Sequence, residues 1–298
     1  MYNTVTTTGT SLQKNKRHPG DVAWYTLIYI CAAFSVALLA TIILYVCAKG
    51  IRAVNWSFLT TVTSVLRGTV GIAGNIVNTL YIIVITMVIA TPIGVGAAVY
   101  LNEYAKPGRL VTVIEFATET LAGIPSIIFG LFGSLFFGVT LNMGYSLLTG
   151  SFTLILMVLP LITRNTQEAL KTVPDSYRNG AIGLGTGKWY MIRTILLPSA
   201  MPGIITGAIL AIGRIVGESA ALLFTAGSAK LLPKALDGYL KKPMQSGGTL
   251  TIQLYLSATS EGDFTTAFGI AVVLLVIVLL INLATKRLAA KFDVHRID

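Results

Sequence analysis

The sequence predicts an all-α membrane protein with six transmembrane helices. Hydrophobic residues make up 54% of the 298 residues and charged residues only 11%, whereas soluble domains carry about 25% charged residues. The mean hydropathy is +0.77, and the apolar residues fall into runs of about 20, the length that spans the hydrocarbon core of a bilayer. Because these runs occupy most of the chain, they leave no room for a large soluble domain.

The chain begins with a polar segment, residues 1–21, that carries three basic residues near its end. This composition predicts a disordered tail with a basic anchor at the membrane surface. Residues 22–71 are expected to form the first transmembrane helix, over 22–48, and an outer loop. The apolar run exceeds the apolar region of about 7 to 15 residues in a signal peptide, so we expect the helix to be retained.

Five further transmembrane helices are expected within residues 72–285, followed by a tail over 286–298. Their approximate ranges are 72–101, 111–139, 145–163, 202–227 and 266–285. Pro92, Pro125 and Pro160 fall inside these helices or near their ends. Neighbouring helices can satisfy the backbone groups that a proline leaves free, so kinks are compatible with spans at these positions.

The net charge of +10 comes from 22 lysine and arginine residues against 12 acidic residues, and the bases cluster at the ends of the apolar runs. With the N terminus inside the cell, about twice as many bases lie on the inner side as on the outer side, so the positive-inside rule predicts cytoplasmic termini. The bases therefore need no nucleic-acid partner to explain them. Cys31 and Cys47 share the first apolar run and form neither a disulfide framework nor a zinc pattern.

A hydrophilic loop, residues 164–200, separates the fourth and fifth expected helices. Within it, Val173, Tyr177, Ala181 and Leu184 recur at helical spacing, which predicts a short helix with an apolar stripe. A stripe on the cytoplasmic side needs a partner, which is either the helix ends of this chain or another protein chain.

The loop also holds the segment GLGTGK, which ends at Lys188 and superficially resembles a phosphate-binding loop. It departs from the P-loop pattern, because Ile182 occupies the position of the first glycine and Trp189 replaces the Ser or Thr after the lysine. A glycine-rich turn between two short helices is the better interpretation. A chain without a nucleotide site must take its energy from a partner or from a gradient.

The same loop resembles the EAA loop of ABC importer permeases, which consists of Glu-Ala-Ala, three further residues, a glycine, nine further residues and Ile-x-Leu-Pro. The matching residues here are Asn179-Gly180-Ala181, Gly185, Ile195 and Leu197-Pro198. Other stretches resemble the phosphate-specific permeases of the PstA type. They are TPIGVGAAVYLNEY (91–104), LAGIPSIIFGLFG (121–133), residues 164–174, GRIVGESAALLFTAG (213–227) and LTIQLY (250–255).

This resemblance implies a type I ABC importer permease with the MetI-like fold, in the cytoplasmic (inner) membrane of a bacterium or archaeon. It implies import of inorganic phosphate that an extracytoplasmic, PstS-like binding protein delivers. The other implied partners are a second, PstC-like permease, two PstB-like ATPase subunits and membrane lipid. ATP and Mg²⁺ then belong to the ATPase, so this chain is expected to be a transport subunit without a cofactor or an ATPase site of its own.

The resemblance also implies that residues 164–200 couple the ATPase to the permease, through a coupling helix that inserts into a groove of the ATPase. The residues assigned to coupling are Tyr177, Arg178, Asn179, Gly180, Ala181, Leu184, Gly185, Ile195, Leu197 and Pro198. The Glu-Ala of the family is Asn-Gly here, which removes a charge, and glycine is about 1 kcal/mol less favourable than alanine in a helix. We therefore expect the apolar side chains of Tyr177, Ala181 and Leu184 to supply the docking energy.

Two charged residues, Arg214 and Glu218, lie within the apolar run of the fifth expected helix. An arginine near the middle of a span costs about 2.5 to 3.5 kcal/mol to insert. Glu218 is four residues further on, so in a continuous helix it lies on the same face, within reach of a charge-assisted hydrogen bond. The pair either holds the helix bundle together or lines the substrate path. In the path, the planar guanidinium would bind phosphate through two parallel hydrogen bonds, and Glu218 would neutralise it when the path is empty.

Glu119 and Arg164 are the other two residues expected along the substrate path. Glu115 is accounted for by a solvated helix start, whereas Glu119 either faces the path or pairs with Arg164 or another internal cation. Arg164 either anchors the fourth helix at the membrane interface or belongs to the exit route. No metal site is expected, because His18 and His295 lie in the tails.

Several alternatives remain open. The chain could be a PstC-type partner permease, a type I permease for another oxyanion, a gradient-driven transporter or channel, or a membrane enzyme. The SAALLFTAG stretch and the compact outer loop after the fifth helix favour the PstA type. The EAA spacing argues against a gradient-driven transporter, which needs no ATPase-docking loop, and the lack of a nucleophile with a neighbouring base argues against an enzyme.

Overall fold

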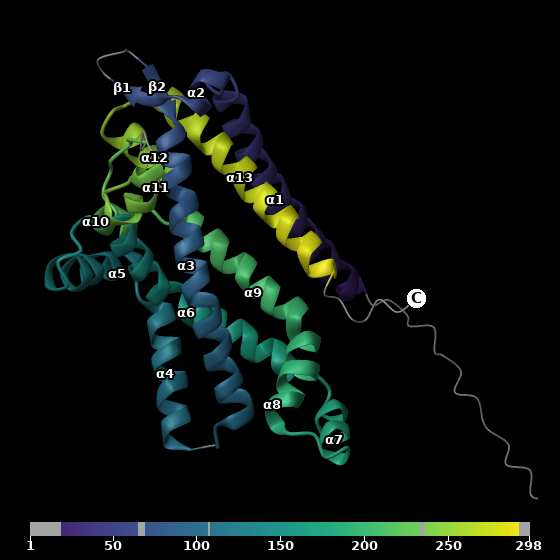
Figure 1. The fold of residues 1–298 in the computed structure, drawn as a ribbon. Coiled ribbons are helices and arrows are strands. Elements are labelled where there is room, and N and C mark those ends of the chain that lie inside the picture. The colour runs from purple at the N-terminus through teal and green to yellow at the C-terminus, as the bar shows by residue number, and fades with distance from the viewer. Residues whose placement is uncertain (1–18, 65–68, 107, 233–235, 292–298) are drawn as a thin grey trace, which may run out of the picture. The chain divides into compact units, whose positions relative to one another are not determined.

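The computed structural model describes residues 19–64, 69–106, 108–232 and 236–291 (Figure 1). Most of the predicted N-terminal tail and the end of the predicted C-terminal tail lie outside these described residues. The chain divides into two units, residues 1–47 and residues 48–298, and each is described by itself.

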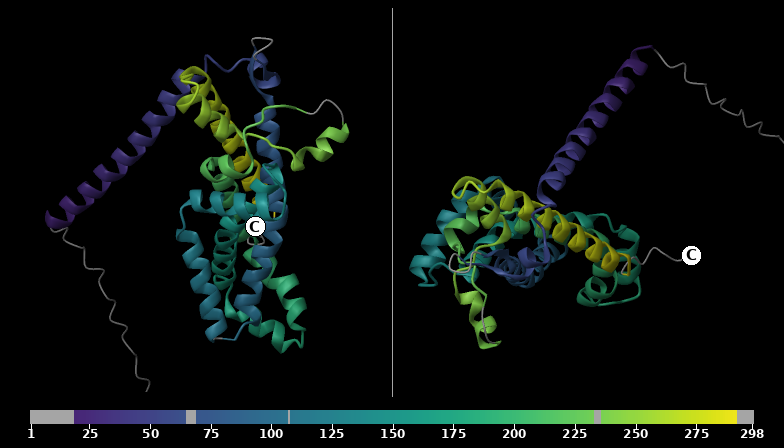
Figure 2. Two further views of the ribbon diagram at one scale, coloured as in Figure 1. Left: turned by 90° about the vertical axis from the view of Figure 1, so that its left-hand side faces the viewer. Right: turned by 90° about the horizontal axis from the view of Figure 1, so that it is seen from above.

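The first unit holds most of helix α1 (Pro19–Gly50), the purple helix in Figure 2. Its segment Val22–Gly50 reaches a mean hydropathy of 2.6 and is long enough to cross a membrane. Apolar residues such as Trp24 and Leu39 occur on all its sides, which is typical of a membrane span and not of a surface helix. The first predicted transmembrane helix is therefore present over the predicted range.

The second unit consists of helices and one small β-hairpin. It begins with α2 (Trp56–Thr60), β1 (Val62–Ser64), β2 (Thr69–Ile72), α3 (Ala73–Val99) and the π-helix η1 (Tyr100–Tyr104). Next come α4 (Arg109–Gly123), α5 (Ser126–Gly133), the π-helix η2 (Ser134–Thr140), α6 (Leu147–Lys171), α7 (Asp175–Gly183) and α8 (Lys188–Met191). The π-helix η3 (Ile192–Leu196) leads into α9 (Leu197–Gly217), and α10 (Ala220–Thr225), α11 (Leu236–Lys241), the 3-10 helix η4 (Lys242–Met244), α12 (Leu250–Thr259) and α13 (Phe264–Lys291) complete the unit.

The hairpin is the one departure from the all-α prediction among the described residues. Strands β1 and β2 are antiparallel, with Val62 opposite Ile72 and Ser64 opposite Thr69. Its residues include several β-branched ones, which suit a pleated strand. The hairpin lies at the end of the unit opposite α7 and α8 (Figure 1).

Helices α3, α6 and α9 form the core of the second unit (Figure 1). Ile82 of α3, Leu154 and Ile162 of α6, and Ala211 and Ile215 of α9 are almost fully buried in one apolar cluster. Near α7 a second cluster continues this core, with Leu170 of α6 and Leu196 of η3 at its centre. The core therefore extends along α6 to the end where the hydrophilic loop is attached.

Glycines allow α6 and α9 to approach closely. A Cβ atom on Gly203 of α9 would lie 2.5 Å from the Cβ atom of Ala169, and one on Gly207 would lie 2.7 Å from the Cβ atom of Asn165. Small residues at such contacts let helix backbones pack together in membrane proteins, where burial of apolar surface does not drive helix association. The spacing of these two glycines thus fixes how α9 lies against α6.

Two predicted spans differ in the structure. The third, expected over 111–139, is broken into α4 and α5, which meet at an angle of 102° next to Pro125. The fifth, expected over 202–227, is a helix over Lys188–Gly217 that stops before Glu218, and α10 is a separate short helix. Within the described residues, five helices are long and apolar enough to span a membrane, or six if the bent pair counts as one.

The last predicted span extends further than expected. Helix α13 runs from Phe264 to Lys291, so the first residues of the predicted C-terminal tail are helical. No glycine or proline interrupts the helix near residue 286, and Lys286 and Arg287 continue it. Their position at the end of an apolar helix is that of basic anchors at a membrane interface.

Replacing Gly203 by alanine tests the α6–α9 contact. We expect a lower midpoint of thermal unfolding in detergent, because an extra methyl group in a packed core costs about 1 to 3 kcal/mol. Gly96→Ala in α3 is the matched control, since no atom lies within 4 Å of the added Cβ atom and alanine favours a helix. Equal midpoints for the two variants would contradict the close packing.

Candidate functional site

A cavity of about 440 Å³ opens between α4, α6 and α9 and collects four charged residues. Glu115 and Glu119 come from α4, Arg164 from α6 and Arg214 from α9. Apolar side chains such as Met157 form much of the remaining wall. Three of the four residues predicted for the substrate path therefore share one cavity, and the fourth, Glu218, does not line it.

Arg214 lies in the last turn of α9, and its side chain is exposed in the cavity. The prediction that it sits near the middle of a helix is wrong, because the helix begins earlier and ends three residues after it, at Gly217. A cation is favourable at this position, since the C-terminal end of a helix carries a partial negative charge. Among the described residues, the guanidinium has no hydrogen-bond or ion-pair partner.

Glu218 caps the next helix instead of pairing with Arg214. Its backbone is extended, with φ −81° and ψ 121°, so the i, i+4 geometry of a continuous helix does not exist here. The Ala221 N–H donates to Glu218 Oε1 at 3.0 Å, which satisfies a free donor at the start of α10. The Thr251 hydroxyl donates to the carbonyl of Glu218 at 3.0 Å. The predicted Arg214–Glu218 pair is therefore wrong, and Glu218 is a buried residue whose carboxylate caps the start of α10.

Arg164 is neutralised by carboxylates on two helices. Its Nη1 lies 3.4 Å from Oε1 of Glu119 in α4, and its Nε lies 3.1 Å from Oε1 of Glu168, one turn further along α6. The predicted pairing of Glu119 with Arg164 is thus confirmed. All three side chains are at least half exposed, so each pair is worth about 0 to 1 kcal/mol. Arg214 remains as the cation of the cavity without an ionic partner.

The predicted short helix in the loop is α7, and the predicted glycine-rich turn follows it. Gly185 has φ +74°, a conformation that favours glycine. Asn179 and Gly180 are exposed on α7. Ile195, Leu197 and Pro198 lie beyond α8, in η3 and the first turn of α9, and the first two pack on the cluster around Leu196. The EAA-like residues therefore fall into two groups. Asn179 and Gly180 are exposed, whereas Ile195 and Leu197 pack inside the chain.

The apolar stripe of this loop is divided between buried and exposed residues. Val173 and Ala181 are buried in the core of the chain, Ala181 with only 3% of its surface exposed. Tyr177 is partly exposed and Leu184 is 84% exposed. The prediction that Ala181 docks on another chain is wrong, because helix ends of this chain cover it. Sequence reasoning missed Ile182, which is exposed beside Leu184.

Arg178 connects α7 to two other helices. Its Nη2 lies 2.9 Å from Oε1 of Glu103 in η1 and donates to the Leu170 carbonyl at 3.0 Å. Its Nη1 donates to the Val173 carbonyl at 2.9 Å and to Asp175 Oδ1 at 3.1 Å. Sequence reasoning included Arg178 but missed Glu103, which is 75 residues away along the chain.

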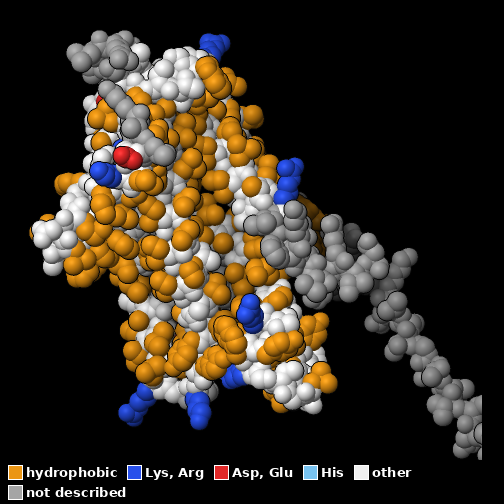
Figure 3. Space-filling model, in the orientation of Figure 1, with side chains coloured by type: hydrophobic (Ala, Val, Ile, Leu, Met, Phe, Trp, Pro, Cys, Tyr) orange, Lys and Arg blue, Asp and Glu red, His pale blue; other side chains and the backbone are white. Residues whose placement is uncertain are grey.

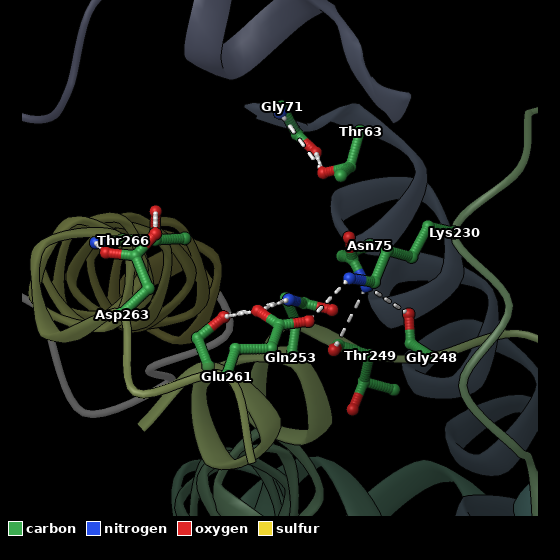
Figure 4. Close-up of polar contacts among 11 residues, drawn as sticks. Thr63, Gly71, Asn75, Lys230, Gly248, Thr249, Gln253, Glu261, Asp263 and Thr266 are labelled. Carbon is green, nitrogen blue, oxygen red and sulfur yellow. Dashed lines mark hydrogen bonds and ion pairs between the residues drawn. The ribbon is translucent and has the colours of Figure 1, made fainter. Parts of the chain in front are cut away.

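At the opposite end of the unit, a polar network joins α3 to the segments around α12 (Figure 4). Asn75 Nδ2 donates to the Gly248 carbonyl at 2.9 Å, and Lys230 Nζ lies 3.1 Å from Oε1 of Glu261. Burial acts to raise the pKa of Glu261, but hydrogen bonds from Ser257 and Lys230 outweigh it and hold the pKa below its ordinary value. Nearby, burial lowers the pKa of Lys242, which is only 2% exposed.

The Glu261 network predicts a pH dependence of stability. Its carboxylate stabilises the fold above the unfolded-state pKa of about 4.5, and this contribution is lost as the pH falls through the lower folded-state pKa. We expect Glu261→Gln to lower the unfolding midpoint at pH 7, and the difference from the original protein to close at strongly acidic pH. Asp237→Asn, at an exposed carboxylate of α11, is the control. A difference that persists unchanged into acid would contradict the role of the charge.

Residues 90–294 match the family of the binding-protein-dependent transport system inner membrane component. The chain is 40% identical over 198 residues to the probable ABC transporter permease protein YqgI of Bacillus subtilis, which covers 66% of this chain and 67% of that protein. It is 31% identical over 269 residues to the phosphate transport system permease protein PstA of Xylella fastidiosa, with 90% and 92% covered. PstA 2 of Mycobacterium tuberculosis is 30% identical over 261 residues, with 88% and 85% covered.

Solved structures of ABC importers share the fold. A chain of a bacterial alginate ABC transporter, in complex with its periplasmic protein, aligns with a TM-score of 0.68 and 14% identity over 92% of this chain and 96% of that chain. A chain of the MetNI methionine transporter aligns with a TM-score of 0.58 and 20% identity over 72% and 93%. The predicted fold class, a type I ABC importer permease with the MetI-like fold, is confirmed.

Such a permease is a multi-pass protein of the inner membrane that works with a partner permease, an ATPase and a binding protein. The family match covers more than half of this chain, and the PstA relatives align over most of it. The chain therefore belongs to the family of binding-protein-dependent transport system inner membrane components.

Proposed function

We propose that this chain is the PstA-type permease subunit of an ATP-driven importer of inorganic phosphate, and that Arg214 contacts phosphate on its way across the membrane. The observation that carries the proposal is that the Arg214 guanidinium has no ionic partner within the described part of the chain, although the other arginine of the same cavity is paired. The alignment with relatives named phosphate transport system permease protein supports phosphate as the substrate.

The chemistry of the cavity suits passage of phosphate. A guanidinium can donate two parallel hydrogen bonds to a phosphate, which an ammonium group cannot do. Three features limit how tightly the anion binds: the carboxylates of Glu115 and Glu119, and the negative end of α9 beside Arg214. A site along a transport path must bind the anion strongly enough for it to enter and weakly enough for it to leave. In the proposed path, Glu115 and Glu119 of α4 offset the positive charge of Arg214, which is the role that the sequence suggested for Glu218.

The partners follow from the same proposal. A PstS-like binding protein delivers phosphate, a PstC-like permease completes the path, and two PstB-like ATPase subunits hold ATP and Mg²⁺, so this chain binds no cofactor. The exposed side chains of Tyr177, Ile182 and Leu184 dock on the ATPase. On the face drawn in Figure 3, Lys and Arg side chains occur along the end of the second unit that carries α7, α8 and the start of α4, which supports a cytoplasmic position for this end. The distribution of bases along the sequence supports a cytoplasmic position for both termini.

Replacing Arg214 by glutamine tests the contact with phosphate. We expect uptake to fall about 10- to 100-fold, because hydrogen bonds to a charged group are worth about 1.5 to 3 kcal/mol. Arg214→Lys keeps the positive charge but loses the planar guanidinium. Its phosphate uptake should therefore lie between that of the original protein and that of Arg214→Gln. Arg109→Gln, at an exposed arginine outside the cavity, is the matched control. The readout is uptake of radiolabelled phosphate by cells that lack other phosphate importers, with membrane levels of each variant measured in parallel.

Normal uptake by Arg214→Gln at normal membrane levels would remove Arg214 from the path. An equal loss with Arg109→Gln would show that the effect is one of general charge. Sulfate as a competing anion separates a phosphate path from one for another oxyanion, since a phosphate importer should not be inhibited by sulfate.

The division of the apolar stripe gives a second test. Leu184→Asp should reduce co-purification of the ATPase without lowering the unfolding midpoint of the permease, because Leu184 is 84% exposed. Ala181→Asp should lower that midpoint, because a carboxylate would be buried in the core of the chain. The reverse pattern would show that the outer face of α7 has been assigned wrongly.

A further inference from the structure

We infer that Arg178 and Glu103 are a positioning pair that makes α7 and the end of α3 move as one body. The inference rests on the proposed function, since it concerns how ATPase movement at α7 reaches the helices of the path. The two residues come from different elements, α7 and the π-helix η1 that continues α3. No substrate contact is assigned to either of them.

The pair is largely shielded from solvent, unlike the ion pairs of the cavity. The exposed fraction of the side chain is 18% for Arg178 and 6% for Glu103, against 87% for Asp175, which also pairs with Arg178. Both Nη2 and Nε of Arg178 point to Oε1 of Glu103, at 2.9 and 3.4 Å. Asn102 Nδ2 donates to the same oxygen at 2.7 Å. Solvent screens such a pair weakly, and its side chains are held in one geometry.

The same guanidinium also reaches the end of α6. It donates to the carbonyl of Leu170 in the last turn of α6 and to the carbonyl of Val173, two residues beyond the end of that helix. Arg178 therefore ties three segments together: α7, η1 and the C-terminal end of α6. Replacement of Glu103 would leave Arg178 with the exposed Asp175 as its carboxylate partner, whereas replacement of Arg178 would remove the cation that Glu103 contacts.

A second contact leads to the same π-helix. Lys188 of α8 places its Nζ 4.8 Å from the centre of the Tyr104 ring, an attractive cation–π arrangement. Glu103 and Tyr104 are neighbours in η1, so the two short helices on either side of the Gly185 turn are attached to one turn of η1. A π-turn of this kind often occurs at a functional position of a helix.

The short helix α7 needs such an attachment to transmit force. It has nine residues, a length at which an isolated helix is marginal, and Ala181 is its buried residue. Helix α3 has 27 residues and is therefore about 40 Å long. Its far end carries Asn75, which holds the segment around Gly248. A displacement of η1 would thus be carried along α3 to the opposite end of the unit.

The experiment uses the assembled importer, reconstituted in vesicles with its ATPase and binding protein. We expect Glu103→Gln to leave assembly and ATP hydrolysis in place but to lower phosphate transported per ATP about fivefold or more, the scale of a typical coupling free energy. Asp175→Asn removes the exposed partner of the same arginine and should change this ratio by less than about twofold. An unchanged ratio in Glu103→Gln would overturn the inference.

A distance measurement needs no phosphate and keeps the inference testable if Glu103→Gln assembles poorly. Spin labels are placed at the exposed positions Ser176 of α7 and Val88 of α3, after replacement of Cys31 and Cys47. In the unaltered pair, the distance distribution should stay narrow with and without ATP and Mg²⁺. In Arg178→Lys, which keeps the charge but loses the fork, ATP should broaden or shift it. A distribution that stays narrow in this variant would overturn the inference, whereas failure of the unaltered complex to transport phosphate would overturn the proposed function alone.

Discussion

The hydrogen bond between the Glu218 carboxylate and the Ala221 N–H is the interaction on which the cavity depends. It starts a new helix where α9 could have continued, and it leaves Arg214 in a last helical turn without an acidic neighbour one turn ahead. Thr251 binds the carbonyl at the same break and so connects α12 to it. At this break the Glu218 carboxylate accepts a hydrogen bond from the start of α10 and does not pair with Arg214. In the proposed path, the Arg214 guanidinium is therefore left to bind an anion.

The two tasks proposed for the second unit, passage of phosphate and attachment of α7, are assigned to different places along the same helices. The cavity lies along α6 and α9, whose spacing is set by glycines, while the attachment of α7 lies at the end of α6 and of α3. Ionic contacts differ accordingly. The contacts around Arg164 are exposed and weak, which would suit the moving wall of the proposed path. The contact between Arg178 and Glu103 is largely shielded from solvent, which would suit the proposed attachment of α7.

The sequence predicts the parts of this architecture that depend on local composition. Long apolar runs identified the membrane helices, the glycine-rich segment identified the turn at Gly185, and the spacing of the EAA-like residues indicated the family. Three features could not be obtained in this way. Pro125 is compatible with a kink as well as with a 102° break, and a carboxylate four residues after an arginine is compatible with an ion pair as well as with a cap for the next helix. Helical periodicity identifies the apolar stripe of α7, but it does not show which residues of the stripe pack against the rest of this chain and which stay exposed.

The central claim, that Arg214 meets phosphate in this cavity, is tested most directly by a structure of the whole importer. Cryo-electron microscopy of the complex stalled with phosphate by an ATPase that binds but does not hydrolyse ATP would show the anion in transit. We expect density for phosphate within hydrogen-bonding distance of the Arg214 guanidinium, with Arg164 still held by Glu119. Phosphate bound elsewhere, with Arg214 turned towards the partner permease or lipid, would contradict it.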